Sequence, residues 1–478
     1  MSKKHRRRKQ KHPFLKFLKF IVVLTSIAVL GLIYLLDILP IKYFAYAAIG
    51  IFLINIIIIK LLSSKKKSKR GFGFFLAIIL LVIEALGINY ELNTMGFFKN
   101  FGFTNYKTET YNVVVWEDNY QDIKELKNKT IGQFDSKESV GLQKAIKKLN
   151  KVISYKENIY DDIVSLSLDL SKDKIDAIIL EDAQLEILEE ENSDLFNSLN
   201  IIYQIPVNIE VEDIKKEVNV TNNSYNIYIS GIDTYGKITK VSRSDVNIIA
   251  TVNPTTHKVL LTSIPRDYYV TLRKYNSKDK LTHAGIYGVE TSVGTLEDLL
   301  DIKINYYIKV NFTSLIRVVD ALGGIDVESN YSFTSKDGYY YKKGTNSLNG
   351  KRALSFVRER SAFEGGDRVR GQNQQIVLSA IINKAASPLI ITKYNDLLAA
   401  VDGSFITNMT EEDITKIIKK QLNEQASWQI ESISLDGKDA FDYTYSYRNN
   451  KLYVMYPDEE TVEQAKTAIN NTMKEKAS

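Results

Sequence analysis

The fold of this 478-residue chain is decided by SYNIYISGID (224–233), SDVNIIATVNP (244–254) and HKVLLTSIPRD (257–267), three long strand-like stretches broken by turns. A helix is expected at FTSLIRVVDALGG (312–324), where Asn311 or Thr313 is placed to cap the start and the paired glycines end it. Strands and a helix alternating in this way predict an α/β sandwich.

The ends of these strands carry charged residues. Asp233 ends the first strand, Asp245 begins the second, and Pro265 ends the third and presents Arg266. Ligands of open α/β folds bind where strands end. These residues, with Arg243 between the first two strands, are therefore the first candidates for a binding site.

Arginines recur in FVRER (356–360) and GDRVRGQNQ (366–374). The planar guanidinium suits bidentate contact with phosphate, and carboxylates suit Mg²⁺, which takes one or two of them plus substrate phosphates. Taken singly, each aspartate is more often a turn or cap residue and each arginine a surface ion-pair partner. Asp267, Glu359 and Asp367 also offer internal compensation for the arginine charge. Composition alone therefore leaves both a magnesium–pyrophosphate pocket and a set of ordinary ion pairs open.

A further helix is expected from Asp367, with that residue as its cap. Arg370 and Gln374 are four residues apart and share a face, and Val377 and Ile381 continue close to it. A polar end with an apolar continuation suits a lipid phosphate whose tail runs along the helix. An ordinary core-facing helix with solvated polar residues is the alternative for this segment alone.

Five blocks, in this order, resemble the LytR–CpsA–Psr (LCP) family, in particular its capsule-operon members. They are GIDTYGKITKVSRSDVNIIATVN (231–253), LLTSIPRDYYV (260–270), KLTHAGIYG (280–288), INYYIKVNFTSLIRVVDALGGIDV (304–327) and ALSFVRERSAFEGGDRVRGQNQQIV (353–377). Five ordered blocks over roughly the second half of the chain are more specific than one short motif. The resemblance implies an LCP-type α/β sandwich with a mixed central sheet.

The resemblance also implies roles for single residues. Mg²⁺ is the expected cofactor, held by Asp233 and Asp245. The implied pyrophosphate-binding residues are Arg243, Arg266, Arg358, Arg360, Arg370 and Gln374, and the implied catalytic residues are Arg266, Arg358, Arg360 and Asp367. Arg368 is a weaker candidate, and Val369 and Gln372 replace a further acid and base of many relatives. Lys280 and His283 also match a family block, with the anchoring of a loop as their expected role.

The activity implied by the resemblance is a Mg-dependent phosphotransferase, an LCP ligase. It would attach a glycopolymer, capsular polysaccharide first, from a polyprenyl-pyrophosphate carrier to peptidoglycan through a phosphodiester. Phosphoryl transfer depends mainly on positioning and charge stabilisation, and the general base is left open between Asp267 and Asp367. The alternatives are a membrane-bound, non-catalytic sensor or regulator of capsule biosynthesis that binds lipid-linked glycan, and a pure glycopolymer-binding module. The expected partners are the lipid-linked glycan, the peptidoglycan acceptor, membrane lipid and, as an open option, other capsule assembly proteins.

The charge of the chain is divided along its length. The first 70 residues hold 16 Lys and Arg and one acid, Asp37, for a net charge of +15, whereas the remaining 408 hold 47 Lys and Arg against 56 Asp and Glu, for −9. A net acidic body argues against nucleic acid as a partner, because such binding needs clustered basic residues. The chain has no cysteine, which excludes disulfides and cysteine-ligated metal centres, and its four histidines argue against a multi-histidine site.

Three apolar runs, at 14–36, 41–62 and 72–88, predict membrane-spanning helices, since each is near the roughly 20 residues that cross a bilayer. A cleaved signal peptide would have only one such run. The basic segments KKHRRRKQK (3–11) and KKKSKR (65–70) place the N-terminus and the second loop in the cytoplasm. The protein is therefore expected at the cell membrane, with its main domains extracellular.

Two polar residues, Asn55 and Glu84, fall inside the second and third runs. Intramembrane polar groups are functional candidates by default. Interfacial snorkelling or a contact between helices is the preferred interpretation here.

Residues 105–215 are expected to form a separate accessory α/β domain. YNVVVWED (111–118) and IDAIIL (175–180) are typical of buried strands, and SVGLQKAIKKLNKV (139–152) and AQLEILEEENSDLFNSL (183–199) of amphipathic helices. No paired arginines, phosphate loop or nucleophile motif occurs there, so no chemistry of its own is assigned to it. The predicted organisation is a basic tail with three transmembrane helices (1–100), the accessory domain (105–215) and the LCP catalytic domain (216–478), whose last part, from 387, completes the fold.

Overall fold

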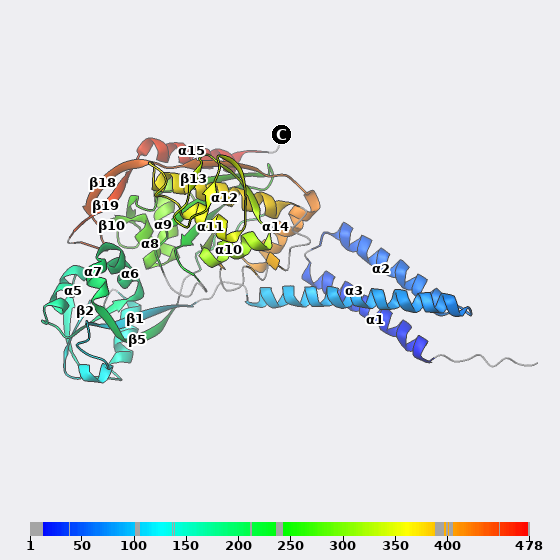
Figure 1. Cartoon of the computed structure of the whole chain (residues 1–478), viewed down its shortest axis with the longest axis horizontal. Coiled ribbons are helices and arrows are strands. Elements are labelled where there is room, and N and C mark those ends of the chain that lie inside the picture. The colour runs from blue at the N-terminus through cyan, green and yellow to red at the C-terminus, as the bar shows by residue number, and fades with distance from the viewer. Residues whose placement is uncertain are drawn as a thin grey trace, which may run out of the picture. The chain divides into compact units, whose positions relative to one another are not determined.

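The structure is a computed structural model that describes residues 13–476 except 38, 101–105, 136, 138, 211–212, 236–241, 388–395, 398–399, 401–404 and 449, and omits the side chains of 93–100, 106 and 107. The basic N-terminal tail expected in the cytoplasm lies outside the described residues. The chain divides into two compact units, Met1–Phe101 with Glu411–Gln425, and Gly102–Thr410 with Ala426–Ser478 (Figure 1).

The first unit contains three helices that are long and apolar enough to cross a membrane. They are α1 (Pro13–Leu36), α2 (Ile41–Leu62) and α3 (Lys67–Asn100). Large apolar side chains such as Phe17, Phe52 and Ile83 are exposed on them, which suits a lipid-facing surface. The three predicted spans are confirmed as helices. The third helix continues well past residue 88, since no proline interrupts it.

The polar residues inside these helices make contacts between helices. The side-chain amide of Asn55 in α2 donates to Ser26 Oγ in α1 at 2.8 Å, and Glu84 in α3 accepts hydrogen bonds from the Thr25 and Ser26 hydroxyls. The interpretation as helix contacts is therefore confirmed for both residues. Glu84 lies well inside α3, because this helix continues past residue 88 to Asn100.

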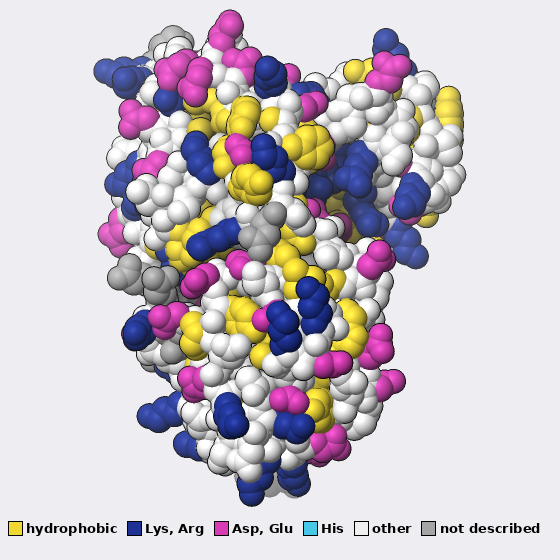
Figure 2. Space-filling view, turned by 90° about the vertical axis from the view of Figure 1, so that its left-hand side faces the viewer, with side chains coloured by type: hydrophobic (Ala, Val, Ile, Leu, Met, Phe, Trp, Pro, Cys, Tyr) yellow, Lys and Arg dark blue, Asp and Glu magenta, His cyan; other side chains and the backbone are white. Residues whose placement is uncertain are grey.

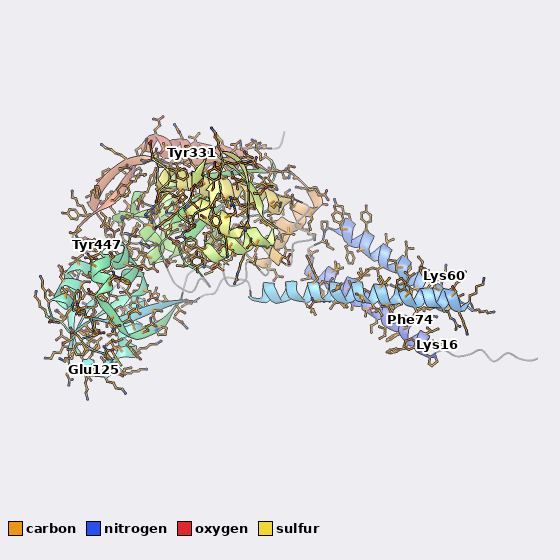
Figure 3. The ribbon with its side chains drawn as sticks, viewed as in Figure 1. Lys16, Lys60, Phe74, Glu125, Tyr331 and Tyr447 are labelled. Carbon is orange, nitrogen blue, oxygen red and sulfur yellow. The ribbon has the colours of Figure 1, made fainter. Side chains whose placement is uncertain are left out.

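Helix α14 (Glu411–Glu424) belongs to this first unit although it is distant in sequence. Lys419 of α14 pairs with Asp37 at 2.6 Å, so the helix lies against the turn between α1 and α2. Lys16 and Lys60 lie at the other end of the helical unit (Figure 3). This amphipathic segment therefore packs with the apolar helices rather than completing the second-half fold.

The accessory part of the second unit is a five-stranded sheet of order β3-β2-β4-β1-β5. Its elements are β1 (Tyr106–Trp116), η1 (Ile123–Leu126), β2 (Thr130–Phe134), α4 (Val140–Leu149), β3 (Lys156–Tyr160), α5 (Ile163–Ser171), β4 (Ala177–Glu181), α6 (Asp182–Glu191), α7 (Ser193–Asn197) and β5 (Leu199–Glu210). The two expected strands and the first expected helix are confirmed. The segment expected as one helix at 183–199 forms two, because Asn192 ends α6 and its side chain caps α7.

This accessory sheet shares a hydrophobic cluster with the remainder of the unit. Ile286 and Tyr447, from the second half of the chain, are buried in the same cluster as Leu185 and Leu188 of α6. Helix α6 is therefore packed by apolar contacts against a second-half cluster that includes Ile286, Tyr447 and Leu452.

The second sheet has the order β16-β11-β6-β7-β8-β17. Its strands are β6 (Tyr225–Ile232), β7 (Val246–Asn253), β8 (Lys258–Ser263), β11 (Tyr306–Asn311), β16 (Phe405–Thr407) and β17 (Gln429–Ser434). The pairs β11–β6 and β8–β17 are parallel and the other pairs are antiparallel. The predicted mixed central sheet is confirmed.

Helices and small strands surround this sheet. The helical elements are α8 (Leu281–Ala284), η3 (Gly285–Tyr287), α9 (Val289–Leu300), α10 (Phe312–Ala321), α11 (Gly350–Arg358), α12 (Asp367–Ala386) and α15 (Glu459–Lys474). The small strands are β9 (Tyr269–Leu272), β10 (Ser277–Lys280), β12 (Ile325–Ser329), β13 (Phe333–Thr334), β14 (Tyr340–Tyr341), β15 (Gly344–Leu348), β18 (Gly437–Tyr443) and β19 (Lys451–Pro457).

Alternate residues of the central strands face opposite sides of the sheet. The cross-strand partners Tyr228 and Ile249 are buried in a core shared with residues of α9 and α15. The next pair, Ile229 and Ile248, faces the other side and lines a cavity together with residues of α10, α11 and α12. One face of the sheet thus stabilises the fold, and the other forms the wall of a cavity.

Two helix starts near this cavity differ in their caps. The Asn311 side chain accepts a hydrogen bond from Ser314 N at 3.0 Å, so Asn311 caps α10 as predicted. The cap of α12 is Gly366, at φ 47°, and the prediction that Asp367 is the cap is wrong. Asp367 lies instead in the first turn, where the helix dipole favours a carboxylate.

The surface charge of the molecule is mixed. Figure 2 shows Lys and Arg side chains interspersed with Asp and Glu over one face, with hydrophobic side chains between them. The acidic excess of the second half therefore does not gather into one acidic surface on that face.

Candidate functional site

A cavity of about 1010 Å³ opens on the second face of the central sheet. All eight residues predicted to bind metal or pyrophosphate line it, namely Asp233, Asp245, Arg243, Arg266, Arg358, Arg360, Arg370 and Gln374. Apolar residues line the rest, among them Ile229, Ile248, Ile308, Val377, Leu378 and Ile381. The cavity joins an arginine-rich region to an apolar interior, which suits an amphiphile with an anionic head.

Asp233 and Asp245 meet where β6 ends and β7 begins. Asp245 N donates to Gly231 O at 2.9 Å, so the strands stay paired up to these residues. Glycine is needed at 231, because a Cβ there would lie 2.6 Å from the Val246 side chain. Burial, followed by the Asp245 charge, raises the pKa of Asp233. Two carboxylates of like charge at this position favour an entering cation.

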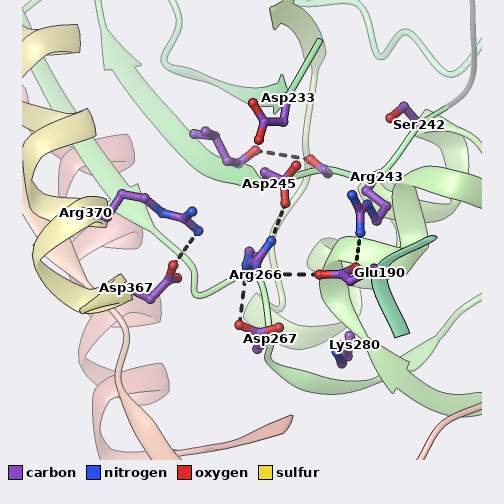
Figure 4. A network of polar contacts seen from close by, with 12 residues as sticks. Glu190, Asp233, Ser242, Arg243, Asp245, Arg266, Asp267, Lys280, Asp367 and Arg370 are labelled. Atoms are coloured by element: carbon purple, nitrogen blue, oxygen red, sulfur yellow. Dashed lines mark hydrogen bonds and ion pairs between the residues drawn. The ribbon is translucent and has the colours of Figure 1, made fainter. Parts of the chain in front are cut away.

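Arg266 lies at the centre of the network in Figure 4. Its Nη1 donates to Asp245 Oδ1 at 2.7 Å, its Nη2 lies 3.7 Å from Glu190 Oε1, and its Nε lies 3.5 Å from Asp267 Oδ2. Burial opposes the charge of Arg266, but Asp267, Asp245 and Glu190 together raise its pKa above the usual value. Arg266 is therefore a fixed and fully charged group.

Arg243 pairs with Glu190, which comes from α6 of the accessory part. Glu186, one turn earlier, accepts hydrogen bonds from Ser242 Oγ at 2.9 Å and from Arg243 N at 3.4 Å. Burial raises the pKa of Glu186, whereas at Glu190 the charges of Arg243 and Arg266 outweigh burial and lower the pKa. The accessory part thus supplies an ionised carboxylate to the site.

The accessory part, to which no chemistry of its own was assigned, contributes Glu190 to the lining of the cavity. A pattern in the sequence could have indicated that Glu190 has a cationic partner. Helix α6 ends in Glu189-Glu190-Glu191 and has no basic residue in its last turn, where the helix dipole disfavours carboxylates. Acids concentrated at a helix C-terminus indicate cationic partners elsewhere in the fold.

Arg358 and Arg360 reach the cavity from the end of α11. The Arg358 guanidinium lies 4.4 Å from the ring centroid of Phe312, and its Nε lies 3.9 Å from Asp233 Oδ1. The aromatic face supports the planar guanidinium while leaving its edges accessible. Arg360 is exposed and lines the same cavity.

Arg370 and Gln374 lie on one face of α12, as predicted, and Val377 and Ile381 continue the lining along that helix. Arg370 pairs with Asp367, which does not itself line the cavity. Burial lowers the pKa of Arg370, and the Asp367 charge does not fully restore it. A buried guanidinium whose charge is disfavoured gains from an entering anion.

A comparison with protein families identifies the second half of the chain. The model of the LytR_cpsA_psr family matches residues 198–471, more than half of the sequence. The chain belongs to this family. The resemblance of the five sequence blocks is therefore confirmed.

Curated relatives of this LytR_cpsA_psr protein include "Polyisoprenyl-teichoic acid–peptidoglycan teichoic acid transferase TagU" of Bacillus subtilis (strain 168). It is 38% identical over 204 residues, which are 42% of this chain and 66% of that relative. TagU of Enterococcus faecalis (strain ATCC 700802 / V583) is 37% identical over 207 residues, 42% of this chain and 68% of the relative. The crystal structure of Bacillus subtilis TagU, at 31% identity, covers 54% of this chain and 100% of that chain with a TM-score of 0.42.

The remaining candidates of this LytR_cpsA_psr protein lie outside the cavity. Arg368 points away from it, with Nε 2.6 Å from Asp436 Oδ1 and Nη2 3.2 Å from Asp439 Oδ1. Lys280 pairs with Glu191 at 2.7 Å. Arg368 and Lys280 thus form ion pairs with neighbouring segments.

His283 is fully buried, and its Nδ1 lies 2.7 Å from Asp279 Oδ1. One ligand atom each of His283, Glu190 and Glu191 lie within 4.8 Å of one another, which would suit a metal ion by distance. Lys280 and Arg243 already neutralise the two glutamates, so a cation there would meet competing positive charges. The contact of His283 with Asp279 and the ion pair of Lys280 with Glu191 are consistent with the anchoring of a loop.

The donor set at Asp233 and Asp245 is of the kind that Mg²⁺ takes, although Asp245 is paired with Arg266 and Asp233 lies near Arg358. Both groups are carboxylates, the hard oxygen ligands that Mg²⁺ prefers, and Mg²⁺ normally takes only one or two of them with substrate phosphates. Burial and the Asp245 charge raise the pKa of Asp233 in spite of the nearby Arg358, so a cation beside it would stabilise the ionised carboxylate. These two residues therefore fit the predicted cofactor, and their metal role stays a prediction.

Proposed function

We propose that this protein transfers a glycopolymer, capsular polysaccharide, from a polyprenyl-pyrophosphate carrier to peptidoglycan. The observation that carries the proposal is the single cavity in which five arginines lie beside an apolar interior. The names of the TagU relatives, with a polyisoprenyl donor and a peptidoglycan acceptor, support the same reaction class. The choice of capsular polysaccharide rests on the likeness to capsule-operon members.

The cavity accommodates the two parts of such a donor differently. The pyrophosphate would lie among Arg243, Arg266 and Arg370, whose planar forks match phosphate oxygens. The prenyl chain would run along α12 past Val377 and Ile381. Burial of that chain supplies non-directional affinity, while the arginines fix the position of the head group.

Mg²⁺ is the proposed cofactor, held by Asp233 and Asp245. When bound, it would neutralise charge on the pyrophosphate and on the departing phosphate. Arg358 and Arg360 would hold the oxygens of the transferred phosphoryl group, where charge develops in the transition state. Asp267 and Asp367 contact Arg266 and Arg370, so their positions suit holding these arginines in place.

The proposed step exchanges one bond at phosphorus for another. A hydroxyl oxygen of the acceptor bonds to the phosphorus that carries the glycan, and the bond from that phosphorus to the bridging oxygen breaks. Polyprenyl phosphate leaves with the bridging oxygen, and the glycan phosphate becomes a phosphodiester. The hydroxyl proton passes to solvent or to a carboxylate of the site.

The proposed location is the outer surface of the cell membrane. The loop at 65–70 and the N-terminal tail are basic, which supports a cytoplasmic location for both. Lys16 and Lys60 lie at that end of the helical unit, and the turn that contacts α14 lies at the other (Figure 3). An external active site would meet both the lipid-linked donor and the wall.

The test is a reconstituted transfer assay with the full chain in detergent. The protein is incubated with polyprenyl-pyrophosphate oligosaccharide, peptidoglycan fragments and Mg²⁺, and the products are resolved by mass spectrometry. Phosphodiester-linked glycan–peptidoglycan and released polyprenyl phosphate are the expected products. Donor binding without any product would refute the transferase and support the non-catalytic sensor.

A further inference from the structure

Glu190 is a member of the site that comes from the accessory part of the chain. The family match begins at residue 198, so Glu190 lies outside it. The residue nevertheless lines the cavity, pairs with Arg243 and faces Arg266 (Figure 4). A carboxylate from the accessory part therefore lies against two of the guanidinium groups assigned to the pyrophosphate.

Each nitrogen of Arg266 has a carboxylate oxygen within 4 Å, but only Nη1 makes a hydrogen bond. Nη1 donates to Asp245, Nε faces Asp267, and Nη2 faces Glu190 at 3.7 Å. A phosphate oxygen that approaches this fork meets the negative charge of the three acids, so its approach is favoured when one of them moves aside. Asp245 and Asp267 lie within the family-matched region beside Arg266, and Glu190 makes the longest of the three contacts.

We propose that Glu190 is a counter-anion that the donor pyrophosphate displaces from Arg243 and Arg266. This inference rests on the proposed function. With the donor absent, the carboxylate compensates the two guanidinium charges and keeps their forks oriented toward the cavity. When the donor binds, phosphate oxygens replace the Glu190 carboxylate, so the accessory part lowers affinity for pyrophosphate and rejects weaker anions.

The displacement needs only a side-chain movement, because α6 has other attachments. Glu186 accepts a hydrogen bond from Ser242 Oγ at 2.9 Å, and Glu191 accepts one from Lys280 Nζ at 2.7 Å. Leu185 and Leu188 are buried in the cluster shared with Ile286 and Tyr447 of the second half of the chain. The helix therefore stays in place while the Glu190 side chain rotates.

The experiment measures binding of geranylgeranyl diphosphate with Mg²⁺ to the full chain in detergent, by calorimetry. Glu190→Gln keeps the shape of the side chain and removes its charge. We expect this variant to bind roughly fivefold more tightly than the wild type, since it removes one competing ion-pair contact. The matched control is Glu191→Gln, which changes the neighbouring acid and its pair with Lys280. The control should bind like the wild type.

A second arm separates displacement from a structural role. In an Arg243→Ala background the gain from Glu190→Gln should shrink, since the two residues act through one contact. If the wild type binds the diphosphate and Glu190→Gln binds it equally or more weakly, the inference is overturned. The proposed transferase function is not affected by that outcome. A wild type that binds no diphosphate would remove the proposed function together with the inference. A gain of equal size in both backgrounds would also overturn displacement from Arg243.

Discussion

The charged and apolar parts of the cavity are built in different ways. The charged part uses residues at the ends of strands and helices, such as Asp233, Arg358 and Arg370, and each has a defined partner. The apolar part uses alternate residues within the strands, such as Ile229 and Ile248, which are one face of an ordinary sheet. Specific geometry is thus concentrated where secondary structure ends.

This difference implies different sensitivities to substitution. A guanidinium in a network with fixed partners has no neighbour that can replace its fork. Removing it should therefore abolish nearly all of the transfer activity. An apolar wall is the sum of many contacts, so one change should reduce affinity in part. The predictions below test this contrast, beginning with the charged part.

The largest effect is expected for Arg266→Ala. Removal of this guanidinium takes away a phosphate contact and leaves Asp245, Asp267 and Glu190 facing one another. We expect the rate of glycan transfer to fall by about 100-fold or more. Arg266→Lys should recover little, because an ammonium cannot reproduce the fork. Transfer near the wild-type rate in either variant, at normal membrane levels, would contradict the assignment.

The next largest effect is expected for the metal ligands. Asp245→Asn and Asp233→Asn should each raise the Mg²⁺ concentration for half-maximal transfer by about tenfold, because each removes one anionic ligand. Burial and Asp245 raise the pKa of Asp233, so protonation sets in at a higher pH than for an ordinary aspartate. The Mg²⁺ requirement of the wild type should therefore increase as the pH falls, and Asp233→Asn should lose that dependence. A Mg²⁺ titration that is identical in all three proteins would remove both residues from the metal site.

The strands of the family-matched region could be predicted from local periodicity, whereas the mixed sheet and the roles of the cavity residues were implied by the resemblance to the family. Asp233, Asp245 and Arg266 could be placed together since each stands at a strand end. Glu190 could not, because a tertiary contact brings α6 to Arg243, 53 residues further along the chain. The position of α14 against the α1–α2 turn was missed for the same reason, since amphipathicity shows that a helix packs but not against what.

A smaller effect is expected in the apolar part. Ile381 lines the cavity on α12, and its neighbour Ile382 does not. Ile381→Asn should raise the KM for a long polyprenyl donor by about threefold to tenfold, since it places a polar group against the prenyl chain. Donors shortened to a few isoprene units should lose this difference. Ile382→Asn is the matched control, and an equal change in KM in both variants would show that the tail does not follow this face.

The smallest effect is expected for Arg368→Ala, two residues from Arg370 on the same helix. The Arg368 fork pairs with Asp436 and Asp439 at a partly exposed surface, whereas Arg370 is buried beside the cavity. Exposed ion pairs contribute little, so transfer by Arg368→Ala should stay within about twofold of the wild type. Arg370→Ala in the same assay should lose most activity. A loss in Arg368→Ala as large as that in Arg370→Ala would mean that charge anywhere on this turn matters, and the contrast between fixed geometry and general charge would fail.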